Sequence, residues 1–73
     1  MNTTLSKALY LALRTKYQSE INSSKATLLI YFNNSVGIGE HPQHLEEMDK
    51  LVENITSHND KLQTLEKEFG NLS

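Results

Sequence analysis

The sequence predicts an all-α fold, in which an antiparallel two-helix hairpin pairs with a second copy to form a four-helix bundle. Three observations predict it: residues 3–33 contain neither proline nor glycine, apolar residues recur at seven-residue spacing in both halves, and a turn-forming segment separates the halves. The 73-residue chain is therefore interpreted as one helical-hairpin domain, residues 1–73, with helix 3–33, turn 34–41 and helix 42–70.

The first predicted helix carries one continuous apolar and aromatic face. Three tyrosines lie on a strict seven-residue spacing, Ser24 fills the remaining place, and two aliphatic residues lie beside that row. The residues of this face are Tyr10, Tyr17, Ile21, Leu28 and Tyr31. Residues 26–32 would also suit a buried strand, but the chain offers no second strand-like run to pair with it, so we favour one helix.

The connection is marked by residues that end helices. Asn and Gly tolerate left-handed backbone conformations, and Pro42 suits the first position of a new helix. Two apolar side chains lie among the glycines of this turn, where an exposed connector would more often be polar. The sequence thus predicts that Val36 or Ile38 packs back between the helix ends, and the alternative is a docking turn for a partner at Val36, Gly37, Ile38 and Gly39.

The second predicted helix has the clearest heptad pattern. Met48, Ile55, Leu62 and Phe69 repeat every seven residues, and other apolar residues flank this row. Asn59 is a candidate for a polar interface residue that fixes register, unless the helix surface turns outward there. Two helices cannot enclose a core alone, so we predict a homodimer whose interface includes Tyr10, Tyr17, Ile21, Leu28, Leu45, Met48, Val52, Ile55, Leu62, Leu65 and Phe69.

Charge divides the chain into two unlike halves. Residues 1–33 carry three lysines and one arginine against one glutamate, a formal charge of +3, whereas residues 34–73 carry eight acids against three lysines, a charge of −5. Opposite charges attract when the helices lie side by side. The chain has no cysteine, so disulfides cannot supplement a thin core and self-association is the route left open.

Most chemical functions lack a signature in this sequence. No nucleophile, phosphate-binding loop or zinc-binding helix motif is present, so we expect no enzyme activity, no catalytic residue and no cofactor. His41 and His44 could contribute to a metal site only if a partner completed it, and we interpret them as polar first-turn residues. Four positive charges over the first half fall short of a nucleic-acid-binding stripe, and no segment predicts a membrane span or a signal peptide.

One segment carries a family resemblance. The string Asn33-Asn34-Ser35-Val36-Gly37-Ile38-Gly39-Glu40-His41-Pro42, followed by an acidic helix, resembles small helical proteins of tailed bacteriophages, marine phages especially. Ser35 stands where those proteins often have proline, which should loosen the turn without moving it. The resemblance covers about half of the chain, and it implies a viral protein made in the cytoplasm of a bacterial host.

These observations favour a binding protein over an enzyme. The main hypothesis is a phage accessory protein that binds itself and an unidentified host or phage protein. A structural or assembly component of the virion is the first alternative, and a nucleic-acid-linked regulator is the second.

Overall fold

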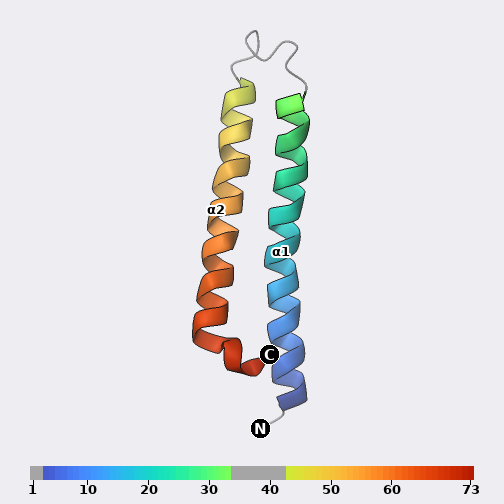
Figure 1. Ribbon diagram of the computed structural model, residues 1–73, viewed down its shortest axis with the longest axis vertical. Helices are drawn as coiled ribbons and strands as arrows, with labels where there is room; N and C mark the ends of the chain where they lie inside the picture. Colours follow the sequence, from blue (N-terminus) through green and yellow to red (C-terminus); the bar gives the residue numbers. More distant parts are fainter. Residues whose placement is uncertain (1–2, 34–42) are drawn as a thin grey trace.

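The computed structural model describes residues 3–33 and 43–73. It contains helix α1 (Thr3–Asn33), helix α2 (Gln43–Phe69) and the short 3-10 helix η2 (Gly70–Leu72), arranged as a rod of 57 × 16 × 13 Å (Figure 1). The predicted all-α class with two helices packed against each other is confirmed. The alternative strand over residues 26–32 is wrong, because α1 runs through this segment and the described residues contain no strand.

The two helices run antiparallel. Contacts between them show this directly, because positions late in α1 meet positions early in α2 and the reverse (Figure 1). From one end of the rod to the other, the contacting pairs are Arg14 with Glu66, Tyr17 with His58, Ser24 with Asn54, and Tyr31 with His44. The turn at residues 36–39, predicted to pack between the helix ends or to dock a partner, lies outside the described residues.

The C-terminal end of α2 differs from its predicted form. The sequence places the helix end at residue 70, but the α-helix ends at Phe69 and the chain continues as η2. The Ser73 backbone N–H and hydroxyl both donate to the Gly70 carbonyl, at 3.2 and 2.8 Å, and these bonds hold the last turn. The Gly70 backbone is accordingly not left-handed, and the last turn is of the 3-10 type.

The hydrophobic core is narrow. Among the described residues, the buried hydrophobic side chains are Tyr10, Ile21 and Leu65, and none of the side chains falls below 2% exposure. A two-helix layer buries only the facing stripe of each helix, so residues beside that stripe stay open to solvent. The rest of the apolar surface is the feature of this molecule most relevant to function.

Candidate functional site

The seam between α1 and α2 is built from rows of residues spaced by seven. In α1 the buried and half-buried positions are those of the predicted tyrosine row, its neighbours Ile21 and Leu28, and Ser6 near the start of the helix. In α2 the centre of the seam is the row His44, Leu51, His58 and Leu65, with Met48, Ile55 and Leu62 half-buried beside it. The sequence pattern placed the Met48 row at the centre, one row away from where it lies.

Two tyrosine–histidine pairs cross the seam. The rings of Tyr17 and His58 lie with their centroids 5.9 Å apart, and those of Tyr31 and His44 lie 5.5 Å apart in an edge-on arrangement. The Lys61 ammonium adds a cation–π contact, 5.7 Å from the centre of the Tyr17 ring. These ring contacts account for the place of both histidines in the central row of α2, and His44 is thus part of the seam as well as a first-turn residue.

A polar layer lies between the two ring pairs. The Asn54 amide donates to the Ser24 hydroxyl at 2.8 Å and to the Glu20 carboxylate at 3.4 Å. His58 is buried, and its Nδ1 lies 2.8 Å from the Asn54 carbonyl oxygen; a carbonyl only accepts, so Nδ1 carries the proton. The polar interface residue is thus Asn54, and Asn59, the sequence-based candidate, is exposed. No sequence signal singles out Asn54, because its role depends on the pairing that brings it opposite Ser24.

The predicted interface residues separate into three groups. Tyr10, Ile21 and Leu65 are buried within the hairpin, whereas Leu45, Val52 and Phe69 are exposed at 64%, 48% and 52%. The half-buried group consists of Tyr17, Leu28, Met48, Ile55 and Leu62. The exposed group is open to a partner chain, and the participation of all eleven residues in an oligomer interface stays a prediction.

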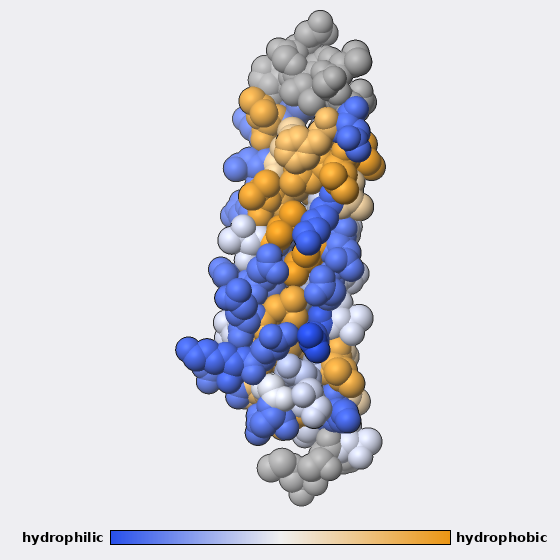
Figure 2. Space-filling model, in the orientation of Figure 1, coloured by the Kyte–Doolittle hydropathy of each residue, from blue (hydrophilic) through white to orange (hydrophobic). Residues whose placement is uncertain are grey.

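One face of the hairpin carries an apolar patch near the end of α1 and the start of α2. We name it the Phe32 patch and define it by Leu28, Leu29, Phe32, Leu45 and Val52; Lys25 borders it, and three of its residues line a shallow cavity of 220 Å³. Figure 2 shows apolar side chains gathered on this part of one face, with mainly polar side chains over the other half, where a few apolar ones show along the centre and one edge.

The ion pair between Arg14 and Glu66 marks the same face. Its N–O distance is 3.3 Å, and both side chains are about half exposed. Leu28 lies two heptads after Arg14, while Val52 and Leu45 lie two and three heptads before Glu66, so all of them project from one side of the hairpin. Leu11, three heptads before Phe32 and 42% exposed, also lies on this face. The face is therefore mainly polar at the end near the chain termini, where Leu11 adds one exposed apolar side chain, and apolar at the other end.

A second apolar surface lies at the end of the rod near the termini. We name it the Phe69 groove and define it by Leu9, Leu13, Phe69 and Leu72, with Tyr10 and Leu65 at its base. Two adjoining cavities of 300 and 320 Å³ share Leu13, Leu65 and Phe69. Leu9 and Ile30 are three heptads apart on one side of α1, whereas Phe32 projects about 200° away from Ile30. The Phe69 groove thus lies on the opposite face from the Phe32 patch.

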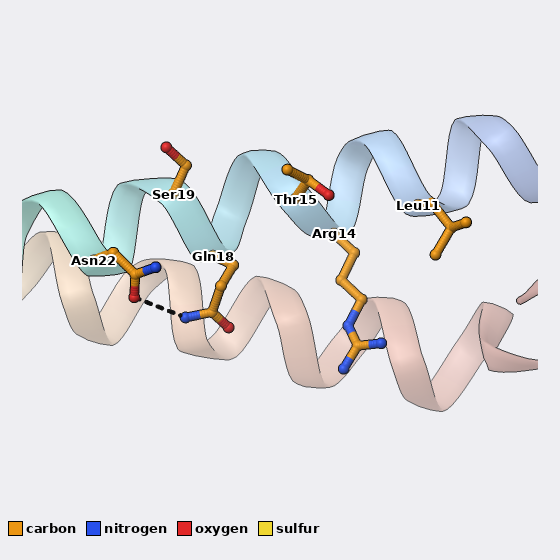
Figure 3. Close-up of a pocket in the computed structure, with 6 residues that line it drawn as sticks. All are labelled: Leu11, Arg14, Thr15, Gln18, Ser19 and Asn22. Carbon is orange, nitrogen blue, oxygen red and sulfur yellow. Dashed lines mark hydrogen bonds between the residues drawn. The ribbon is translucent and has the colours of Figure 1, made fainter.

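A third concavity lies on α1 alone. It measures 480 Å³ and is lined by Leu11, Arg14, Thr15, Gln18, Ser19 and Asn22 (Figure 3). The Gln18 amide donates to the Asn22 side-chain oxygen at 3.1 Å, and Figure 3 shows Arg14 directed toward α2. Because one helix supplies every wall, this is a shallow polar surface that offers no enclosed site for a small molecule.

Metal-binding groups and membrane-crossing helices are not found in the described ranges 3–33 and 43–73. No three side chains of the His, Cys, Asp and Glu types come together there, and neither α1 nor α2 combines the length and apolar content needed to cross a bilayer. His44 packs against Tyr31, and His41 lies outside the described residues. Comparison of the chain with protein-family models, curated proteins and solved structures finds no match.

Proposed function

We propose that this chain is a non-enzymatic phage accessory protein, which acts in the bacterial host cytoplasm by binding other protein chains through its helical hairpin. The supporting observation is the balance of apolar residues: in the part of the chain that the structure describes, three hydrophobic side chains are buried and ten large ones are exposed. Seven of the ten belong to the Phe32 patch or the Phe69 groove, and exposed apolar residues gathered in this way are typical of interaction sites.

The first partner in this proposal is a second copy of the chain. The chain exposes 5571 Å², whereas a compact monomer of 8.3 kDa would expose about 4,600 Å². The excess of about 1,000 Å² is close to the ~800 Å² that each partner contributes to a stable interface. Self-association into a four-helix bundle removes this excess, and an unidentified host or phage protein binds what remains.

The charge arrangement supports a nucleic-acid-linked regulator less well than it supports a protein that binds other protein chains. The basic residues of α1 lie beside a helix that carries seven acids against three lysines, and Arg14 is already paired with Glu66. A neighbouring field of opposite sign weakens the attraction to phosphate. A gel-shift assay at low salt should therefore show no retardation of DNA or RNA.

Sedimentation equilibrium of the purified chain across the micromolar range tests the proposal. We expect a concentration-dependent mass that approaches twice 8.3 kDa. A mass that stays monomeric throughout, together with no specific partner captured from infected cells, would contradict it. Mass spectrometry of purified virions tests the alternative that the chain is a structural or assembly component of the virion, since abundant copies in the particles would support that alternative over the accessory role.

A further inference from the structure

We infer that the homodimer forms face to face through the Phe32 patch, with a twofold axis parallel to the helices. In this arrangement α1 of each chain lies against α2 of the other, and the same ends of both hairpins lie together. The inference rests on the proposed self-association and adds to it the surface and the symmetry. Two independent observations, the position of the patch and the charges of the helices, select this arrangement.

The position of the patch selects how the ends align. A twofold interface brings each surface element against a copy of the same face, so a patch at one end meets itself only if the two hairpins point the same way. If one hairpin is turned end over end, the patch lies against the mainly polar half of that face, which carries Arg14, Gln18 and Asn59 beside the single leucine Leu11. Sliding the turned hairpin until the patches meet leaves most of both faces uncovered.

The charges of the helices select the same symmetry. Residues 3–33 of α1 carry Lys7, Arg14, Lys16 and Lys25 against Glu20, or +3, while residues 43–69 of α2 carry seven acids against three lysines, or −4. A twofold axis parallel to the helices puts each basic α1 against the partner's acidic α2, and attraction then crosses the interface. The end-over-end arrangement puts α1 against α1 and α2 against α2, where like charges repel.

The dimer leaves the second apolar surface accessible. The Phe69 groove lies on the opposite face and at the opposite end of the hairpin, so a dimer that covers the Phe32 patch keeps one open groove on each outer side. The two surfaces can therefore be tested separately, with substitutions that act on one and not on the other.

Three lysine substitutions identify the face. Phe32 and Ile30 are 62% and 66% exposed near the end of α1, but they project to opposite sides, so Ile30→Lys is a matched control for Phe32→Lys. A cation suits both positions because the C-terminal end of a helix is electronegative. Leu9→Lys, at a residue 61% exposed, tests the Phe69 groove. We expect Phe32→Lys to raise the dissociation constant of the dimer at least about tenfold. Ile30→Lys and Leu9→Lys should change that constant less than about twofold.

Spin labels identify the symmetry. The chain has no cysteine, so Ala12→Cys, Ser19→Cys and Ala26→Cys each provide one label, and the three exposed positions follow one row at seven-residue intervals. Each interval spans about 10 Å along the helix. With the axis parallel to the helices, the label-to-label distance across the dimer is the same for all three variants. In any end-over-end dimer the three distances cannot all be equal, because each depends on the height of the label above the axis.

The outcomes separate this inference from the proposed function. Equal label distances, with loss of dimer in Phe32→Lys alone and unchanged far-UV circular dichroism, support it. A dimer disrupted by Leu9→Lys but not by Phe32→Lys, or unequal label distances, overturns the inference and leaves self-association intact. A wild-type chain that stays monomeric overturns the proposed dimer itself.

Discussion

Replacing Asn54 with alanine tests the polar layer that joins the two helices. The substitution removes the 2.8 Å bond to Ser24, whose side chain is 4% exposed, and the longer bond to Glu20. A buried hydroxyl that loses its donor costs about 1–2 kcal/mol, while alanine in place of asparagine returns roughly 0.6 kcal/mol of helix propensity. We expect Asn54→Ala to lower the free energy of unfolding by about 0.5–1.5 kcal/mol.

Asn59→Ala is the matched control. It makes the same change of side chain five residues later in α2, at an exposed position, so it gains the same helix propensity and loses no seam contact. Urea denaturation followed by far-UV circular dichroism, at one fixed protein concentration, should then separate the two variants by about 1–2 kcal/mol. Equal stabilities of Asn54→Ala and Asn59→Ala would refute the assignment of Asn54 to the seam.

A double-mutant cycle isolates the hydrogen bond. With Ser24→Ala alone, the Asn54 amide loses its acceptor, and with both residues replaced, no orphaned polar group remains. The double variant should therefore be less destabilised than the sum of the single variants, by a coupling energy of roughly 1 kcal/mol. Strict additivity would mean that the two side chains do not interact in solution.

Four further predictions follow from burial and charge. Ile55→Asp puts a carboxylate into the half-buried side of the seam and should cost at least about 2 kcal/mol, seen as lost helical circular dichroism; near-native helicity would show that this side is exposed. Arg14→Ala should change the unfolding free energy by less than about 0.5 kcal/mol, since both partners of the ion pair are about half exposed. Gly70→Ala should stabilise the chain by about 0.4–1 kcal/mol in thermal melts, because an added Cβ meets nothing within 4 Å and the backbone is not left-handed. The melting temperature should rise with protein concentration, as expected when the folded chain is a dimer, and a constant value would contradict this.

The fold was predictable because its determinants are local. A long segment free of Pro and Gly, seven-residue spacing and a segment of helix-ending residues together fix two helices and the stripe on α1 that faces α2. Tyr10 and Ile21, which the spacing placed on that stripe, are buried in the structure. Periodicity is a property of the chain itself, so no knowledge of the partner helix was needed.

The choice of row in α2 was not predictable from hydropathy. Counting apolar residues favours the Met48 row, because His44 and His58 are scored as polar. A histidine can nevertheless be buried when its ring stacks on a tyrosine and one nitrogen bonds within its own helix, as His58 does with the Asn54 carbonyl. Both conditions depend on which residues of α1 lie opposite, and that information exists only once the helices are paired. For the same reason, the sequence pattern favours Asn59 over Asn54 as the polar residue of the interface.

The composition of the seam determines register more strongly than it adds stability. Tyr17 and Tyr31 are fourteen residues apart, as are His58 and His44, and Ser24 meets Asn54 between the two ring pairs. Sliding α2 by one heptad would put Tyr17 opposite Leu51 or Leu65 and would bring Glu47 or Lys61 to the level of Ser24, so both ring pairs and the hydrogen bond would be lost. Each lost polar contact leaves a buried group without its partner, and an incorrect register is therefore costly. Ser24, Asn54 and His58 contribute less burial free energy than aliphatic side chains would at the same places, so the apolar core of the hairpin is thin. A hairpin built in this way has a defined register before binding, and the dimer proposed above would add, at the Phe32 patch, the apolar burial that its own seam lacks.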